Sequence, residues 1–212
     1  GIAHEDVEAR IADFVRQQLL GVPLVAKVEQ FGVQNEKVNI LFSNQKFAQL
    51  GVPMEQIVNQ AAKLRYMTGG QFDVPAVFVS TYGAGNRVAA QHSDTPYPVF
   101  MNLAGIKIVV PSTPAEAKGL FKAAIRDDNP VLFLVPVMLV GMKGEVPEGE
   151  HLLEIGTADV KRRGDDVTLV AIGAMVKEAL SAAQTLEGEG VSAEVIDPRT
   201  LLPMDVDAIL HS

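Results

Sequence analysis

The residues best suited to chemistry lie in one glycine-rich stretch of the chain. His92 stands between Gln91 and Ser93, shortly after TYGAGNR, where Gly83 and Gly85 allow positive φ angles and close approach of a ligand. A histidine in a polar loop can donate a proton or stabilise charge near neutral pH. Taken alone, the residues are also explained by a structural histidine that hydrogen-bonds the backbone in an ordinary strand-to-helix turn.

A second polar group follows a helical pattern further along the chain. Asp127, Asp128 and Asn129 come directly after PAEAKGLFKAAIR. Carboxylate, amide and free helix-end carbonyl oxygens are hard ligands that suit a cation. A polar helix stop without an ion explains the same residues, so both interpretations stay open. The chain has no cysteine, which excludes disulfides, thiolate metal sites and a cysteine nucleophile.

The elements that must hold these groups alternate between helix and strand from Met54 to Leu134. The pattern predicts a helix from Met54 to the glycines 69 and 70, strands over 74–80, 106–112 and 131–140, and a helix over 114–126. This alternation is typical of a parallel sheet with helices on its faces. The glycine-rich loop then follows the first of these strands at its C-terminal end, where open α/β sheets bind ligands.

The C-terminal third predicts a second, smaller unit. Residues 141–166 are rich in glycine and charge and are typical of an exposed linker. A strand over Val167–Ile172, a helix over Met175–Leu186 and a strand over Ala193–Ile196 then form a βαβ pattern. One such unit cannot bury both of its faces, so we expect a partial domain.

The start of the chain and its composition indicate further secondary structure and limit the classes of partner and the location. Residues 1–20 predict an acidic amphipathic helix, and 24–28 and 38–42 are strand-like runs that could pair. The net charge is −8 without a basic patch, so neither nucleic acid nor an anionic membrane is an expected partner. No apolar run approaches the ~18 residues of a membrane span, and no signal-peptide profile is present. We therefore expect a cytoplasmic protein.

Four stretches together resemble the β subunit of the E1 component of 2-oxo acid dehydrogenase complexes, in the transketolase-like, thiamine-diphosphate-dependent group. They are QIVNQAAKLRYMTGGQ, GAGNRVAAQHS, VVPSTPAEAKGLFKAAIRDDNPVLFL and VSAEVIDPRTLLP. The resemblance implies an α/β fold, a three-layer parallel sheet with helices on both faces. It places a pyrimidine-binding domain over 1–145, atypical in 1–53, and part of a transketolase C-terminal domain over 155–212.

The resemblance also implies an activity, cofactors and partners. The β subunit pairs with an α subunit, and thiamine diphosphate binds between them, its pyrimidine end on β and its diphosphate held through Mg²⁺ on α. Potassium is a further ion of the family. The E1 enzyme oxidatively decarboxylates a 2-oxo acid such as pyruvate and passes the acyl group to lipoyl E2. A twofold β–β contact within a heterotetramer is expected.

The family's functional residues map onto positions of this sequence. The histidine of the QHS motif, which assists acyl transfer, maps to His92. The positions assigned to the cofactor are Gln91 and Phe47. The positions assigned to the potassium ion are Ala124, Ile125, Asp127 and Asn129. The resemblance therefore favours the functional interpretation of both polar groups.

Departures from the family pattern support a second hypothesis. The family's activating glutamate in a TPISE-like segment has no counterpart, Val135 and Val137 replace charged residues, and QHSQ reads QHSD with Asp94. A non-catalytic homologue that serves as an assembly or regulatory module is the alternative. A stand-alone transferase for sugar phosphates ranks third, because Arg87 and Arg126 are the only basic residues placed in loops to grip phosphate. The sequence leaves pyruvate, branched-chain 2-oxo acids and acetoin open as substrates.

Overall fold

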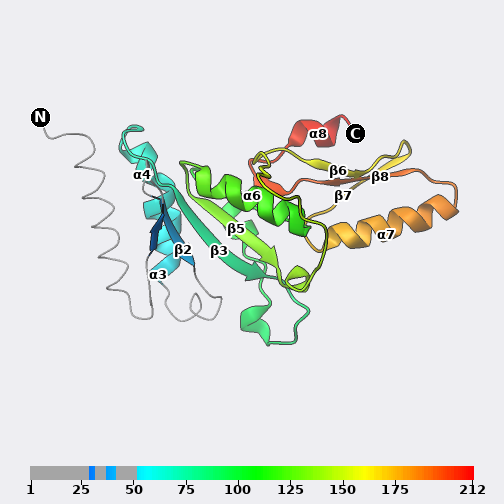
Figure 1. The fold of residues 1–212 in the computed structure, drawn as a ribbon, viewed down its shortest axis with the longest axis horizontal. Helices are drawn as coiled ribbons and strands as arrows, with labels where there is room; N and C mark the ends of the chain where they lie inside the picture. Colours follow the sequence, from blue (N-terminus) through cyan, green and yellow to red (C-terminus); the bar gives the residue numbers. More distant parts are fainter. Residues whose placement is uncertain (1–28, 32–36, 42–51) are drawn as a thin grey trace, which may run out of the picture.

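The computed structural model describes residues 29–31, 37–41 and 52–212, with side chains from Met54 onward. The helix predicted over 1–20 and the predicted cofactor residue Phe47 lie outside the described residues. Figure 1 shows two sheets next to each other, the first built mainly from the middle of the chain and the second from its C-terminal part. Within the described ranges, no helix combines the length and apolar character needed to cross a bilayer.

The first sheet has four parallel inner strands and an antiparallel strand at each edge. Among the described residues, its six strands in spatial order are β1 (Glu29–Phe31), β2 (Lys37–Leu41), β3 (Ala76–Tyr82), β5 (Val131–Pro136), β4 (Lys107–Val109) and β9 (Thr200–Leu202). The pairs β2–β3, β3–β5 and β4–β5 are parallel, whereas β1–β2 and β4–β9 are antiparallel. The predicted α/β class is confirmed, and the two edge strands make the sheet mixed rather than fully parallel.

Helices cover both faces of this sheet, which gives three layers. They are α3 (Val52–Glu55), the π-helical turn η1 (Gln56–Ala61), α4 (Ala62–Met67), α5 (Tyr97–Met101) and α6 (Pro114–Arg126). Because side chains alternate along a strand, Phe78 and Leu132 pack in the core under η1, α4 and α5, while Val77 and Phe133 pack under α6. The carboxyl ends of β3, β4 and β5 therefore meet at one edge of a sheet that is buried on both sides.

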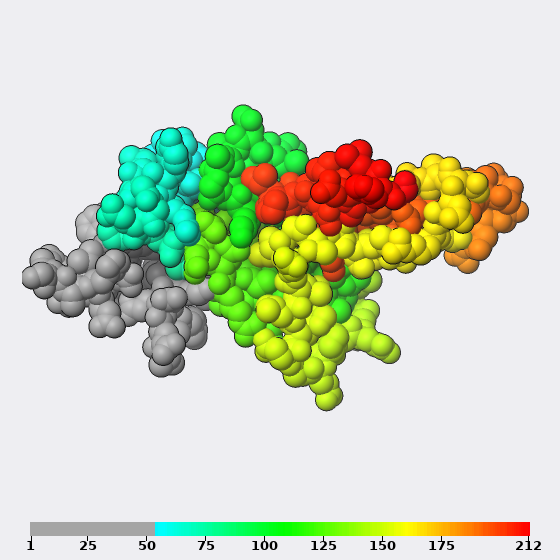
Figure 2. All heavy atoms as spheres, turned by 90° about the horizontal axis from the view of Figure 1, so that it is seen from above, coloured from blue at the N-terminus to red at the C-terminus, as the bar shows by residue number. Residues whose placement is uncertain are grey.

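The second sheet is smaller and lies beyond α6, and Figures 1 and 2 both show this C-terminal part (yellow to red) on the opposite side of the middle of the chain from η1 and α4. Its described strands, in spatial order, are β6 (Asp159–Arg162), β8 (Ala193–Asp197) and β7 (Val167–Val170). Two helices accompany it, α7 (Met175–Gly188) and α8 (Val206–Leu210), and Figure 1 shows them on opposite sides of the strands. The βαβ order β7–α7–β8 is the one that the sequence predicted, and its core includes Ala183, Ala193 and Val195.

Several details differ from the sequence-based expectations. Part of the predicted linker forms β6, which pairs antiparallel with β8. The third predicted strand ends at Pro136 instead of residue 140, and a 3-10 turn η3 (Val137–Leu139) follows. The physical reason is that the pairing with β3 stops at the partners Tyr82 and Pro136, so the chain beyond has no ladder to continue. After β8 the chain crosses back and adds β9 to the first sheet.

The strand pair near the N-terminus uses residues 29–31, and not the predicted run 24–28, as the first strand. The antiparallel pair joins β1 and β2, with Gln30 opposite Val38. β2 coincides with the predicted run 38–42 except at its ends, whereas β1 lies in the stretch expected to be a turn. The other predicted run, 24–28, lies outside the described residues.

Candidate active site

A strained loop joins β3 to α5 at the carboxyl edge of the first sheet. The N–H of Gly83 donates to the carbonyl of Asp94 over 2.9 Å and closes the loop at its base. As predicted, Gly83 and Gly85 have positive φ angles, +91° and +130°. Arg87 at +54° and Ala89 at +69° also have positive φ angles, which cost a non-glycine residue on the order of 1 kcal/mol or more. Strain of this kind collects at functional loops, where the surrounding structure maintains it.

The turn that follows β5 packs directly on this loop. A Cβ atom on Gly85 would lie 2.0 Å from Sδ of Met138 in η3, so the backbone at Gly85 touches the methionine sulfur. Glycine is favoured here by its φ angle, whereas the contact with the flexible and exposed Met138 side chain could be relieved by a change of rotamer. Figure 1 shows the loop extending beyond the arrowheads of β3 and β5.

His92 and Gln91 lie on this loop in a single 3-10 turn, η2 (Ala90–His92). The turn is fixed by its neighbours, because the hydroxyl of Ser93 donates to the carbonyl of Ala89 over 2.9 Å and its N–H donates to that of Ala90 over 3.0 Å. His92 is half-buried and Gln91 is exposed. The structure therefore presents an imidazole and a carboxamide together at the carboxyl edge of the sheet, where they can meet a group bound from outside.

Two tyrosines hold the base of the loop. Tyr82 ends β3 and meets Tyr97 of α5 edge to face, with 5.5 Å between ring centroids. Burial raises the pKa of the Tyr82 phenol well above its usual value, and Tyr97 and the negative charge of Asp197 add to the rise. Tyr82 therefore stays neutral and acts as a packed anchor. The turn at Gly173 of the second unit crosses the same phenol, because a Cβ there would lie 2.5 Å from its oxygen.

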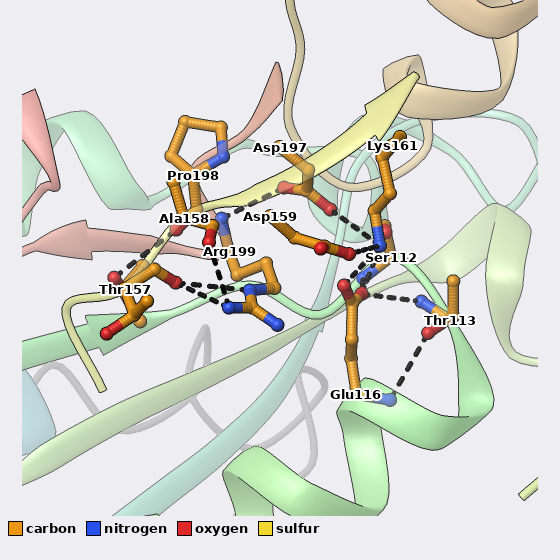
Figure 3. Close-up of polar contacts among 11 residues, drawn as sticks. Ser112, Thr113, Glu116, Thr157, Ala158, Asp159, Lys161, Asp197, Pro198 and Arg199 are labelled. Carbon is orange, nitrogen blue, oxygen red and sulfur yellow. Dashed lines mark hydrogen bonds and ion pairs between the residues drawn. The ribbon is translucent and has the colours of Figure 1, made fainter. Parts of the chain in front are cut away.

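A buried charged cluster lies next to this anchor, between the two units (Figure 3). Glu116, in the first turn of α6, accepts hydrogen bonds at Oε2 from the N–H of Ser112 over 2.9 Å and from its hydroxyl over 2.8 Å. Its other oxygen forms an ion pair with Lys161 of β6. The same ammonium lies 2.8 Å from Oδ2 of Asp159 and 3.9 Å from Oδ2 of Asp197. The cluster thus joins α6 to both β6 and β8.

Burial shapes the protonation of this cluster. Asp197 is fully buried, and burial together with the negative charge of Glu116 raises the pKa of its carboxyl to about 6. Oδ1 accepts the N–H of Arg199 over 2.9 Å, whereas Oδ2 receives no hydrogen bond. The Ser112 hydroxyl beside Asp197 donates to Glu116, and together with the Arg199 N–H it offsets part of the rise in the pKa of Asp197. Burial alone would lower the pKa of the Lys161 ammonium, but hydrogen bonds to Asp159 and Glu116 outweigh this and raise it. Lys161 therefore stays charged while Asp197 titrates near neutral pH.

Local sequence patterns do not reveal this cluster. Thr113 and Glu116 have the residue types and the spacing of a helix capping box, and the structure contains the full capping box. The run VIDPRT was part of a stretch that resembles the family, but nothing in it indicates that Asp197 meets a lysine 36 positions earlier. Lys161 itself lies in a charged stretch that is typical of a solvated linker.

The residues assigned to a cation lie at the opposite edge of the sheet from His92, where α6 ends and β5 begins. Ala124 is buried and Ile125 half-buried. Oδ2 of Asp127 lies 2.5 Å from the ammonium of Lys107, and its Oδ1 accepts the backbone N–H and the side-chain amide of Asn129 over 2.9 and 3.0 Å.

The Asp127 carboxylate is therefore already neutralised by groups of the chain. Burial would raise the pKa of Asp127, but the hydrogen bonds from Lys107 and Asn129 outweigh it and lower the pKa. In the part of the chain that the structure describes, no group of three or more His, Asp or Glu side chains could hold a metal ion. The ligands assigned to Ala124 and Ile125 are main-chain carbonyls, which do not depend on such a group of side chains. The cation site stays a prediction.

The comparisons with known proteins agree with this geometry. Residues 33–143 match the family model of the transketolase pyrimidine binding domain. This chain belongs to that family. Residues 156–212 match the model of the transketolase C-terminal domain. The match to the pyrimidine binding domain covers all the loop from Gly83 to Asp94, and it begins at residue 33, within the range 1–53 that was expected to be atypical.

The relatives of this chain include β subunits of three enzymes. It is 51% identical over 163 residues to acetoin:2,6-dichlorophenolindophenol oxidoreductase subunit beta of Bacillus subtilis, covering 77% of this chain and 48% of the relative. It is 46% identical to 2-oxoisovalerate dehydrogenase subunit beta of the same organism, covering 79% and 52%. The pyruvate dehydrogenase E1 subunit beta of B. subtilis is 44% identical, with 75% and 49% covered. The resemblance to E1 β subunits is thereby confirmed.

The chain spans about half the length of the curated relatives it matches. Among solved structures, it is similar to a split gene transketolase described as an inactive beta4 tetramer. The TM-score is 0.63 at 27% identity, over 82% of this chain and 53% of the other. This likeness supports the α/β transketolase-like fold that the sequence predicted.

Proposed function

We propose that this chain acts as a β subunit of a thiamine-diphosphate-dependent 2-oxo acid dehydrogenase E1. One observation carries the proposal most directly. The QHS segment lies at the carboxyl edge of the parallel sheet in a chain that is 44% to 51% identical to β subunits of this class. Ligands of open α/β sheets bind at that edge. The reaction is oxidative decarboxylation of a small 2-oxo acid, with transfer of the acyl group to lipoyl E2.

The described residues fit the pyrimidine end of the cofactor better than its diphosphate end. The loop offers an imidazole, a carboxamide and the tyrosine-anchored turn, and Arg87 is the only cation on it between Gly83 and Asp94. A diphosphate with Mg²⁺ needs more positive charge or more oxygen ligands than this loop supplies. We therefore assign the diphosphate and Mg²⁺ to an α subunit. Phe47, a further assigned contact, lies outside the described residues.

His92 is assigned the proton work at this site. Bound thiamine diphosphate supplies the carbanion chemistry at the keto carbon of the substrate. The half-buried His92 imidazole is held by the η2 turn, and its role is to hold or deliver a proton at the substrate or acyl oxygen. Gln91, exposed beside it, is assigned to orient the bound group. Removing a general acid or base of this kind typically costs ~10²–10⁴ in rate.

Reconstitution with an α subunit tests the proposal. The chain is mixed with the α subunit that accompanies one of its B. subtilis relatives, and binding of thiamine diphosphate with Mg²⁺ is measured by titration calorimetry. Turnover of pyruvate, 2-oxoisovalerate and acetoin is followed with 2,6-dichlorophenolindophenol as electron acceptor. We expect binding in the mixture only, and turnover of at least one substrate.

The matched variants are His92→Ala and His211→Ala. His211 is exposed at the end of α8, and its ring forms a hydrogen bond with the carbonyl of Asp207. We expect His92→Ala to lose ~10²-fold or more in turnover while cofactor binding changes little, and His211→Ala to match the unchanged chain. Absence of both binding and turnover with competent α subunits would contradict the proposal.

The non-catalytic alternative has one structural observation in its favour. Val135, which replaces a charged family residue, packs half-buried against the core under α6 and adjoins the loop that η3 supports. An assembly module would bind an α subunit without turnover, and His92→Ala would leave its binding unchanged. Thiamine-dependent turnover that disappears in His92→Ala excludes this alternative.

Assembly and location remain parts of the same proposal. A twofold contact between β chains, pairing with α chains as a heterotetramer, and docking to lipoyl E2 are expected from the class. The split gene transketolase to which the fold is similar is described as a beta4 tetramer. Sedimentation of the chain alone and with an α subunit tests the first two. Potassium binding at Asp127 and a cytoplasmic location stay predictions from the sequence.

A further inference from the structure

The cluster between the two units carries more negative charge than its one ammonium can neutralise. Glu116 and Asp159 both engage Lys161 directly, whereas Asp197 reaches it only at 3.9 Å. Asp197 is 0% exposed and its Oδ2 has no hydrogen-bond donor. A buried, unpaired carboxylate oxygen is costly in its ionised form, and protonation removes that cost.

The surroundings leave Asp197 no better partner. The ionisable groups that face it come from every element packed around it, namely Tyr82 on β3, Glu116 on α6, Asp159 and Lys161 on β6, and Arg199 after β8. Arg199 turns its guanidinium to the carbonyls of Thr157 and Ala158, over 2.8 to 3.1 Å. Only its backbone N–H reaches Asp197. Figure 3 shows the guanidinium and the ammonium on different sides of this carboxylate.

The cluster also lies where the two units are joined. Asp197 ends β8, and two residues later the carbonyl of Arg199 accepts the N–H of Val110, which brings the chain onto the edge of β4. Glu116 belongs to the first unit and Lys161 to the second. Opening the junction would let water reach Asp197 and would separate Glu116 from Lys161. The protonation of Asp197 and the closure of the junction are therefore linked.

We propose that this junction is a proton-sensitive clamp, which closes more tightly when Asp197 holds a proton and loosens when Asp197 is ionised. The clamp affects the loop of His92 through Tyr82, which touches the Gly173 turn of the second unit and immediately precedes that loop.

The direction and size of the pH effect follow from the linkage between proton binding at Asp197 and closure of the junction. The pKa of Asp197 is about 6 in the closed junction against 3.8 for an exposed aspartate. The closed state therefore binds the proton more tightly and gains stability as pH falls. Between pH 7 and pH 5 the closing constant should rise about tenfold. Below about pH 4 the open state is protonated as well, and the gain levels off.

Hydrogen exchange of the full chain tests the clamp. The protection factors of the Val110, Ser112 and Arg199 amides report on the junction, because each donates to an acceptor inside it. We expect these factors, corrected for the intrinsic pH dependence of exchange, to rise about tenfold from pH 7 to pH 5. Amides in the middle of α7 should change less and serve as the reference.

Variants separate the clamp from a general pH effect. Asp197→Asn should remove the rise, whereas Asp165→Asn, the same change at an exposed turn, should keep it. Glu116→Gln removes a neighbouring negative charge and should move the midpoint of the rise to lower pH, and Lys161→Met should move it to higher pH. These opposite shifts remain measurable if Asp197→Asn does not fold. Equal junction protection at pH 5 and pH 7, or an unchanged rise in Asp197→Asn, would overturn the proposal.

Discussion

Replacing Gly173 by alanine should destabilise the contact between the second unit and the first. A Cβ at this position would lie 2.5 Å from the Tyr82 oxygen, 2.8 Å from Cγ of Pro136 and 3.2 Å from Cγ1 of Val110. These atoms belong to β3, to β5 and to the residue after β4, all buried. Gly173 also has a φ of +54°. The alanine would therefore meet both a steric clash and a disfavoured backbone conformation.

Each of these two costs has a known scale. A left-handed conformation costs a residue with a Cβ about 1–2 kcal/mol. Overpacking a well-packed site costs typically about 1–3 kcal/mol. We therefore expect Gly173→Ala to lower the free energy of unfolding by roughly 2–5 kcal/mol. For a chain of this length, each kcal/mol lowers Tm by about 2–4 °C.

Two other glycines of the same unit separate the two costs. Gly190 has a φ of +84° but no atom within 4 Å of its Cβ position, so Gly190→Ala should show only the conformational cost, about 1–2 kcal/mol. Gly188, the last residue of α7, has neither a positive φ nor a neighbour within 4 Å. Gly188→Ala should therefore gain about 0.5–1 kcal/mol from the lower entropy of the unfolded chain.

Urea unfolding at pH 7, followed by circular dichroism and tyrosine fluorescence, measures all three variants. The chain has no tryptophan and three tyrosines, so the emission comes from Tyr82 and Tyr97 near the contact and from Tyr66, which is 90% exposed and should change little on unfolding. We expect the order of stability Gly188→Ala, unchanged chain, Gly190→Ala and Gly173→Ala, from highest to lowest. If Gly173→Ala costs no more than Gly190→Ala, the packing of Gly173 on three strands of the first sheet is not what requires a glycine there.

Three further changes test other parts of the structure. Thr113→Ala removes the hydroxyl that accepts the N–H of Glu116 over 3.2 Å and should cost about 1 kcal/mol of stability, whereas Thr113→Ser should cost little. Gly119→Ala would place a Cβ 2.6 Å from Leu153 and 3.1 Å from His151, so limited proteolysis should cut residues 141–155 faster although α6 itself gains helix propensity. Slower cutting would contradict the packing of that segment on α6. Lys107→Met removes the partner of Asp127 and should cost roughly 1.5–3 kcal/mol at pH 7. Because the pKa of Asp127 lies below its ordinary 3.8, its stabilisation is present above pH 3.8 and is lost as pH falls further, so the variant should lose less stability on acidification below about pH 4. An equal loss in both proteins would show that Lys107 does not set this pKa.

Local patterns were sufficient to predict the elements that carry the loop. The strand before it, the glycines at 83 and 85, and the helix begun by Thr113 and Glu116 each follow from residues within a few positions of one another. Burial on both faces favours continuous apolar runs such as Val131–Leu134, which mark a strand in the sequence. Such runs do not specify how the strands are aligned with one another in the sheet.

Contacts between distant residues were not predictable from the same patterns. The sequence of β6 is polar and predicts an exposed segment, yet the Lys161 side chain is only 12% exposed and meets carboxylates that lie 36 and 45 positions away. β9 is three residues long, and its place depends on an open edge at β4 rather than on its own sequence. The stop of β5 at Pro136 likewise depends on where β3 ends. In each case the deciding partner lies on another element.

The return of the chain to the first sheet through β9 has a consequence for aggregation. β9 pairs with the outer side of β4, whose Ile108 and Val109 are fully buried. If the chain were cut within residues 141–158 and the two parts separated, β4 would present unpaired N–H and C=O groups beside an apolar core. Such an open edge is a template for pairing with other chains. The C-terminal part of the chain thus shields the first unit from self-association, and the first unit on its own would need a replacement for β9.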